Sequence, residues 1–252
     1  MRRAVFDLSR EELLQQIYLA DGEGVRIGVI DTGICQKHPM LCHRIVSCRN
    51  CTPENTVEDQ NGHGTHVAGL IASSGYGISP RSALYIAKAF TKNGYAKQSS
   101  IEDAISWLRK QQVFVINLSF CPCRSDLRLP QLSKQIIVGV AGWKEAKRQM
   151  LTAVAVDHGG VPLSDSYAQF ALPGNNILST YKNCSYARLS GSSMAAAYLT
   201  GMIARIQQIA KWTEGRYLEK EEMIAILCRI ARFGPYLATV CQYGYLNIPC
   251  RI

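Results

Sequence analysis

Long apolar runs are missing from this sequence of 252 residues. No stretch approaches the roughly 18 consecutive apolar residues of a membrane-spanning helix. Residues 1–16 begin with a short basic segment, but acidic and amide residues follow where a signal peptide would have its apolar core. We therefore expect no membrane interaction and a cytoplasmic protein, unless an upstream segment has been cut off.

Internal repeats, low-complexity tracts and linkers are also missing, so nothing in the composition divides the chain. Hydrophobic side chains make up 47% of the residues, which is enough for a chain of this length to bury a substantial core. We expect a single domain over residues 1–252, without a prodomain.

Acidic residues are in the minority, with 19 Asp and Glu against 28 Lys and Arg, a formal net charge of +9. Such an excess favours acidic partners through long-range attraction. The basic residues are scattered, however, and the one tight cluster, Lys144, Lys147 and Arg148, has no interleaved aromatic residues. We therefore expect a solvated basic surface and no nucleic-acid binding.

The ten cysteines lack the full pattern of a zinc site. Cys48 and Cys51 have the spacing of one ligand pair, but no second such pair follows at the usual interval. Cys35 and Cys42 precede them in the same short stretch. Without a secretory signal we expect reduced thiols, with disulfides or a structural zinc ion as the open alternatives.

Hydrophobic patterns predict strands that alternate with helices. Ser9 and Glu12 form a capping box that opens an amphipathic helix. Strands are expected at 26–30, 83–89, 113–118, 136–141 and 151–156, further helices at 64–72, 101–111, 193–212 and 219–231, and a cysteine-rich loop before the second helix. This alternation predicts an α/β fold with three layers, in which helices cover both faces of a mainly parallel sheet.

Three short segments supply the groups of a catalytic triad. Asp31 lies in Val-Ile-Asp-Thr-Gly, His63 in Asn-Gly-His-Gly-Thr-His, and Ser193 in Ser-Gly-Ser-Ser-Met-Ala. A serine hydroxyl needs a neutral imidazole to take its proton, and the imidazole needs a carboxylate to fix its tautomer. Each segment alone also fits an ordinary turn or helix start. Their combination favours a nucleophilic serine.

In this order and context the three segments resemble the subtilisin-like serine peptidases, or subtilases. Nearly the whole chain shares the resemblance, because segments at 84–88, 115–119, 154–157 and 171–174 also match. It implies a subtilisin-like fold in which Asp31 orients the general base His63 and Ser193 is the nucleophile. Ser193 would begin a long helix, whose N–H groups and dipole favour the oxyanion. His66 matches a position without a catalytic role, and we expect it to be packed.

The resemblance also suggests where a substrate would bind. Two segments match the strands between which such enzymes hold an extended peptide, which adds as a third strand. They consist of Gly94, Tyr95 and Ala96, and of Leu118, Ser119 and Phe120. An interpretation as a plain loop and a strand end stays open for them.

Some positions depart from the family pattern. Trp143 stands where the family has an oxyanion-binding Asn, and the loss of such a donor costs about 2.7–4 kcal/mol of transition-state stabilisation. The stretch between Trp143 and the strand near Leu151, which usually walls the specificity pocket, is short. Met40 and the short segment 73–82 remove the usual calcium site, so we expect no metal.

These observations predict a serine endopeptidase that cleaves peptide bonds through a Ser acyl-enzyme, on a restricted substrate such as a precursor peptide. A macrocyclising transpeptidase shares the acyl-enzyme, and a catalytically weak pseudoenzyme that binds peptides is the other alternative. An aspartic peptidase needs a second Asp-Thr-Gly or Asp-Ser-Gly, which the sequence lacks. The expected partner is a peptide or protein substrate, without a cofactor, and the oligomeric state is left open.

Overall fold

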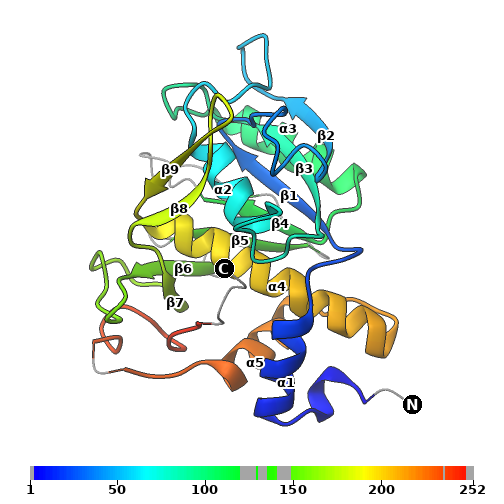
Figure 1. The fold of residues 1–252 in the computed structure, drawn as a ribbon, viewed down its shortest axis with the longest axis vertical. Helices are drawn as coiled ribbons and strands as arrows, with labels where there is room; N and C mark the ends of the chain where they lie inside the picture. The colour runs from blue at the N-terminus through cyan, green and yellow to red at the C-terminus, as the bar shows by residue number, and fades with distance from the viewer. Residues whose placement is uncertain (1–2, 120–128, 130–134, 141–148, 235, 248–252) are drawn as a thin grey trace.

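The computed structural model describes residues 3–119, 129, 135–140, 149–234 and 236–247. Seven parallel strands form the central sheet in the order β2-β3-β1-β4-β5-β6-β7 (Figure 1). Their bounds are β1 Arg26–Asp31, β2 Ile45–Asn50, β3 Ala83–Lys88, β4 Val115–Leu118, β5 Ile136–Val140, β6 Met150–Val156 and β7 Phe170–Pro173.

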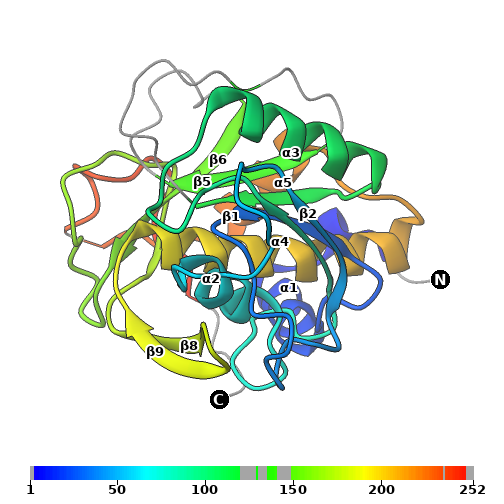
Figure 2. The same ribbon diagram turned by 90° about the horizontal axis from the view of Figure 1, so that it is seen from above.

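Helices cover both faces of this sheet. Figure 2 shows α3 on one side and α2 and α4 on the other. A short 3-10 helix, η1, precedes α1, and the bounds are η1 Val5–Asp7, α1 Arg10–Leu19, α2 His63–Ala72, α3 Gln98–Lys110, α4 Ser192–Glu214 and α5 Lys220–Ile230. Because both faces are covered, β5 and β6 are buried at every position and consist almost entirely of apolar residues.

The predicted elements are confirmed, with small shifts at their ends. The capping box at α1 is present, since the Ser9 side chain accepts from the Glu12 N–H and the Glu12 side chain accepts from the Ser9 N–H. The predicted α/β architecture, with helices on both faces of a mainly parallel sheet, is likewise present. Within the described residues, no helix combines the length and the apolar character that crossing a bilayer requires.

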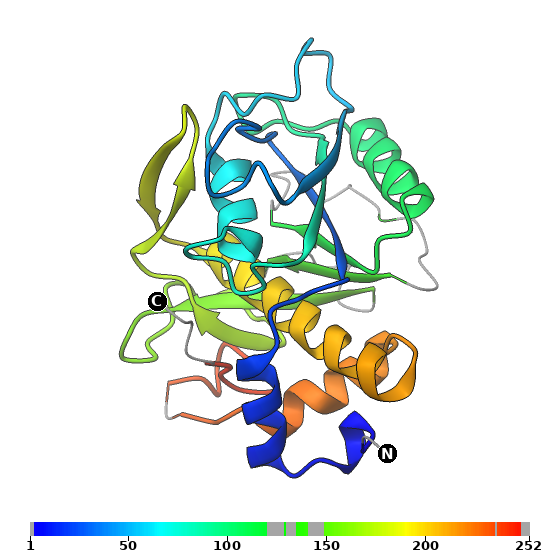
Figure 3. The same cartoon turned by 45° about the vertical axis from the view of Figure 1, so that its right-hand side comes forward.

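Some parts of the architecture were not predicted, including the short helix η1 and the edge strand β7. The expected cysteine-rich loop contains β2, an edge strand that pairs with β3 and is partly exposed along its length. Strands β8 (Ile177–Tyr181) and β9 (Ser185–Leu189) form an antiparallel hairpin outside the main sheet. The hairpin lies beside α2 (Figure 3), and β8 contacts that helix.

Candidate active site

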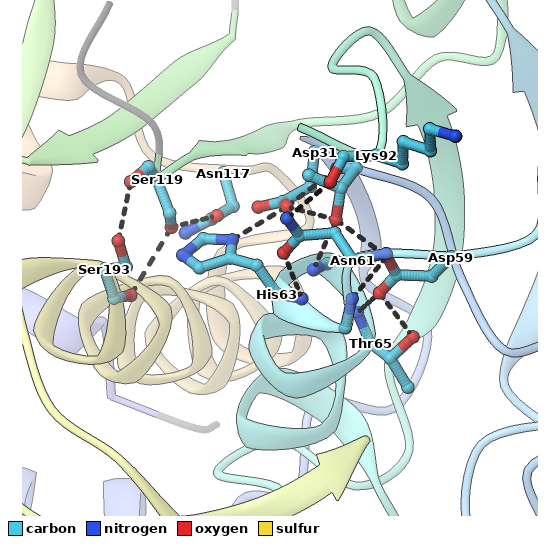
Figure 4. A network of polar contacts seen from close by, with 12 residues as sticks. Asp31, Asp59, Asn61, His63, Thr65, Lys92, Asn117, Ser119 and Ser193 are labelled. Carbon is cyan, nitrogen blue, oxygen red and sulfur yellow. Dashed lines mark hydrogen bonds and ion pairs between the residues drawn. The ribbon is translucent and has the colours of Figure 1, made fainter. Parts of the chain in front are cut away.

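The predicted triad lies where the carboxyl end of β1 meets the starts of α2 and α4 (Figure 4). Asp31 is the last residue of β1, and Ser119 directly follows β4. Val29 pairs with Asn117 in the register of these neighbouring strands, so Asp31 and Ser119 lie level with each other at this edge. Ligands of parallel α/β sheets bind outside such strand ends.

Asp31 and His63 are in direct contact. The Nδ1 atom of His63 donates to Oδ1 of Asp31 at 2.8 Å, because an ionised carboxylate only accepts. This hydrogen bond leaves Nε2 as the ring atom that can take a proton. Asp31 is completely buried, whereas the His63 side chain is 18% exposed. Figure 4 shows one ring nitrogen of His63 directed at Asp31 and the opposite edge of the ring directed toward Ser193.

Burial and the neighbouring carboxylates act on the His63 pKa in opposite directions. Burial is the largest single effect and lowers the pKa, while the charge of Asp31, its hydrogen bond and the charge of Asp59 raise it. The carboxylates prevail, so the pKa of His63 lies above its ordinary value of 6.5. The site therefore stabilises the imidazolium that forms when the ring takes a proton.

Ser193 lies in the first turn of α4, which begins at Ser192. Its hydroxyl donates to the backbone carbonyl of Ser119 at 2.8 Å. The Ser119 hydroxyl in turn donates to Oδ1 of Asn117 at 2.5 Å, and the Asn117 amide donates to Thr200 of α4 at 2.9 Å. These bonds fix the start of α4 to the end of β4. The positive end of the helix dipole thus lies at Ser193, where it favours negative charge.

The helix that carries His63 begins with its backbone donors satisfied. An α-helix leaves its first four N–H groups without partners inside the helix. In α2, whose N-cap is Gly62, nearby side chains accept from all four of these groups. The pairs are Gly62 N to Asp59 Oδ1 at 2.8 Å, His63 N to Asn61 Oδ1 at 3.2 Å, Gly64 N to Thr32 Oγ1 at 3.0 Å and Thr65 N to Asp59 Oδ2 at 2.8 Å.

Gly64 allows α2 to approach the end of β1 closely. A Cβ atom at this position would lie 2.4 Å from the carbonyl oxygen of Gly33 and 3.1 Å from the Asp31 side chain. No real side chain fits at that distance from backbone. Because Gly64 has no Cβ atom, α2 can approach β1 closely enough for His63 to hydrogen-bond Asp31 at 2.8 Å.

Asp59 is a second buried carboxylate in this region and is 2% exposed. It binds donors from the turn after β1 and from the start of α2, and so joins the two segments that carry Asp31 and His63. The donors are Thr32 Oγ1 at 2.9 Å, Asn61 N at 3.1 Å, Gly62 N at 2.8 Å, Thr65 N at 2.8 Å and Thr65 Oγ1 at 2.7 Å.

Lys88, the last residue of β3, is completely buried and holds the loop that contains Asp59. Its ammonium group donates to the Glu58 carbonyl at 2.8 Å and pairs with the Glu54 carboxylate at 2.9 Å. Burial raises the Glu54 pKa, but hydrogen bonds and the charges of Lys88 and Lys92 outweigh burial and lower it. An ion pair between the buried Lys88 and the partly exposed Glu54 thus anchors this loop to the sheet next to Asp31.

His66 lies one turn after His63 on the same helix but has a different environment. Its Nε2 atom contacts the carbonyls of Ile177 and Ala187 at 3.0 and 3.2 Å, so Nε2 carries the proton. Burial is the main cause that lowers the His66 pKa to about 4. His66 is therefore neutral and packed, as the sequence predicts.

The segments predicted to bind substrate differ in structure. Leu118 and Ser119 are buried at the end of β4. Gly94, Tyr95 and Ala96 lie in the loop between β3 and α3, directly after a turn at Lys92 and Asn93, and not in a strand. The turn requires φ +73° at Gly94, and the Tyr95 carbonyl accepts from the N–H of Thr91. The backbone at Tyr95 is therefore hydrogen-bonded within its own loop. The Tyr95 side chain is 57% exposed.

Some predicted positions lie outside the described residues. They are Phe120, the oxyanion-region Trp143 and the basic cluster Lys144, Lys147 and Arg148. Among the described residues, no group of three or more His, Cys, Asp or Glu side chains could hold a metal ion. The described cysteines, including Cys48 and Cys51, are free thiols.

Sequence reasoning missed the supporting residues around the triad. Asp59 precedes Gly62 and His63 by a short interval, which is a spacing suited to helix capping. That spacing could have indicated its role. Lys88 gave no such signal, because its partner Glu54 lies far away in the sequence and a lysine that ends a strand is ordinarily exposed.

Comparisons with known proteins agree with this geometry. Residues 22–162 match the subtilase family. The major intracellular serine protease of Bacillus subtilis (strain 168) is 29% identical over an alignment that covers 90% of this chain and 82% of the relative. The intracellular serine protease of Paenibacillus polymyxa is 31% identical, with 82% of this chain and 74% of the relative covered.

A solved structure supports the fold independently. The crystal structure of a cold adapted subtilisin-like serine proteinase superimposes with a TM-score of 0.73 at 23% identity. The superposition covers 92% of this chain and 91% of that chain. The predicted subtilisin-like fold is therefore confirmed.

Proposed function

This chain belongs to the subtilase family of serine endopeptidases, and we propose that Ser193, His63 and Asp31 are its nucleophile, general base and orienting acid. The observation that carries this assignment is the 2.8 Å hydrogen bond from His63 to the buried Asp31. It leaves Nε2 of His63 directed toward the start of the helix that bears Ser193 (Figure 4).

In the proposed reaction, the Ser193 hydroxyl turns its hydrogen bond from the Ser119 carbonyl to Nε2 of His63, which then takes the proton from the Ser193 oxygen. The Ser193 oxygen attacks the substrate carbonyl carbon, and the protonated His63 then gives its proton to the leaving amine. An acyl-enzyme remains, and a water molecule hydrolyses it by the same steps with His63 again as base. Asp31 stays ionised throughout and stabilises the imidazolium.

We propose that the substrate is a restricted peptide, such as a precursor peptide, bound in extended form near Ser119. The short sequence between Trp143 and Leu151 supports this proposal, because the matching segment in the family walls the specificity pocket. Tyr95, exposed on its loop, is proposed as a contact for the peptide. Two relatives are named as intracellular serine proteases, which supports an intracellular site of action.

The nucleophile is tested by labelling with a fluorophosphonate and mapping the label by mass spectrometry. Ser193→Ala is expected to abolish the label. Ser192→Ala is the matched control, because Ser192 is adjacent in the same helix turn, and this variant should still be labelled at Ser193. A label on Ser192, or one that survives Ser193→Ala, would refute the assignment.

Substrate range and reaction type are tested with a peptide library of random sequence. The proposal predicts cleavage at a small set of related sites, whereas cleavage at many unrelated sites would contradict it. The product masses separate the two reactions of the acyl-enzyme, because hydrolysis adds one water to the fragments and ring closure adds none. Products without added water would replace the endopeptidase proposal with a macrocyclising transpeptidase.

A further inference from the structure

Two cysteine sulfurs are in contact beside the proposed active site. Cys35 and Cys184 are 149 positions apart in the sequence, yet their Sγ atoms are 3.5 Å apart. The backbone N–H of Cys184 also points at the Cys35 sulfur, at 3.4 Å. Cys35 is buried and lies four residues after Asp31, whereas Cys184 is exposed at the tip of the β8–β9 hairpin.

The hairpin tip is a tight turn. Asn183 and Cys184 both have positive φ, at +58° and +53°, as the two central residues of a tight hairpin turn do. The N–H of Ser185 donates to the Lys182 carbonyl at 3.2 Å and closes the turn. This turn places Cys184 against Cys35.

The same hairpin covers the segment that begins α2. The Tyr181 hydroxyl donates to the Asn61 carbonyl at 3.1 Å, and the Lys182 ammonium donates to the Gln60 carbonyl at 3.1 Å. The Thr180 hydroxyl donates to the Thr65 carbonyl at 2.8 Å. The hairpin therefore holds both ends of the short segment that contains His63, and all of these bonds are noncovalent.

We propose that Cys35 and Cys184 are a redox-responsive pair, and that their disulfide fastens the hairpin tip to the segment that follows Asp31. The two sulfurs are in van der Waals contact and need to approach by about 1.5 Å to bond. The oxidant is a low-molecular-weight disulfide such as oxidised glutathione. In a reducing compartment the pair stays open, and it closes when the thiol pool becomes oxidised.

The reaction proceeds by two thiol exchanges. The exposed Cys184 thiolate attacks the small disulfide, which forms a mixed disulfide and releases one small thiol. The Cys35 sulfur then attacks Sγ of Cys184 and releases the second small thiol. Two protein thiols lose two electrons, one small disulfide gains them, and the two protons of the protein thiols end on the small thiols.

The second exchange limits the rate. Burial is the largest effect on Cys35 and, together with the nearby Cys184 and Glu58, raises the pKa of its thiol to about 11. Thiolate is the attacking species, so only a small fraction of Cys35 reacts at neutral pH. Ring closure is expected to accelerate about tenfold for each unit by which the pH rises toward that pKa.

The test oxidises four proteins with oxidised glutathione, all carrying Ser193→Ala to prevent self-digestion. They are the parent and the additional variants Cys35→Ser, Cys184→Ser and Cys42→Ser. After thiols are blocked, peptide mapping should find Cys35 joined to Cys184 in the parent. Its Tm should rise by about 5–10 °C and return to the starting value with dithiothreitol.

The controls separate this pair from the other cysteines. Cys42→Ser should keep the cross-link and the Tm gain, because Cys42 lies outside the pair, whereas Cys35→Ser and Cys184→Ser should lose both. Cys184 is exposed, so its serine variant tests the idea without a change in the core. A parent without the Cys35–Cys184 peptide, or a Tm gain that survives in Cys184→Ser, would overturn the proposal.

Discussion

Replacement of Asp59 by alanine tests whether one buried carboxylate holds the two halves of the site together. Its oxygens accept from the Thr32 hydroxyl, from the backbone N–H groups of Asn61, Gly62 and Thr65, and from the Thr65 hydroxyl. The hydroxyl groups can turn to other acceptors, but the three backbone donors cannot. Asp59→Ala therefore leaves three N–H groups without an acceptor around the start of α2.

The size of the effect follows from these donors. A buried donor without a partner costs about 1–3 kcal/mol, and the lower half of that range applies because water can enter the emptied space. Three donors then give a loss of about 3–6 kcal/mol in the free energy of unfolding. Since the start of α2 carries His63, a shift of about 1 Å there would lower kcat/KM by roughly 10²-fold.

Urea denaturation and kcat/KM for an activated peptide ester measure the two effects. Glu58→Gln is the matched control, because it removes the same charge one residue away and is expected to stay within about 1 kcal/mol of wild type. Asp59→Asn keeps the shape but places an N–H₂ group among donors, so it should also lose activity. The reasoning fails if Asp59→Ala unfolds within about 1 kcal/mol of wild type and retains its kcat/KM.

Three further predictions concern titration and charge. The kcat/KM should rise with pH as His63 loses its proton. The midpoint of this rise should lie above pH 6.5, because Asp31 raises the His63 pKa. A pH–rate profile with a lower midpoint would contradict this prediction. The raised pKa of His63 also stabilises the folded state below pH 6.5. This contribution to the free energy of unfolding is lost as the pH rises through the folded-state pKa. His66, with a pKa of about 4, should have the opposite effect, because the unfolded chain takes up a proton before the folded one does. The free energy of unfolding should therefore fall as the pH drops from about 6.5 to 4. Urea titrations in which His66→Gln shows the same fall as wild type would refute this prediction. Lys88→Met should lower the free energy of unfolding by about 2–3 kcal/mol, because it leaves the Glu54 carboxylate without its ion-pair partner. Glu54→Gln in the same protein should restore part of that loss. Additive losses in a double-mutant cycle would show that the two side chains do not stabilise each other.

The interior of the fold was predictable because its elements have strong local patterns. Strands such as β6 consist almost entirely of apolar residues, and the capping box of Ser9 and Glu12 marks the start of α1. Strand β2 has no such pattern, because it lies at the sheet edge and its sequence, Ile-Val-Ser-Cys-Arg-Asn, neither alternates nor forms a long apolar run. Its pairing with β3 is a tertiary contact, which periodicity alone does not reveal.

The site was predictable where chemistry requires a short motif, and not where it depends on distant contacts. The segments around Asp31, His63 and Ser193 identified the candidate groups directly. For Gly94–Ala96 the sequence left a strand and a plain loop open, and the structure shows a loop with positive φ at Gly94. Spacing and resemblance give no information on backbone conformation, so they did not decide between the two.

The two histidines of α2 show how little separates a base from a packing residue. His63 and His66 lie one turn apart on the same helix, and burial lowers the pKa of both. Around His66, the Ile177 and Ala187 carbonyls offset only part of that effect, and the ring stays neutral. Around His63, the full negative charge of Asp31 at 2.8 Å reverses the direction of the shift. A backbone carbonyl and a carboxylate accept similar hydrogen bonds. Only the charge of the carboxylate stabilises the imidazolium enough to outweigh the lowering of the pKa by burial. The difference between the two rings therefore lies in their partners and not in the helix that carries them.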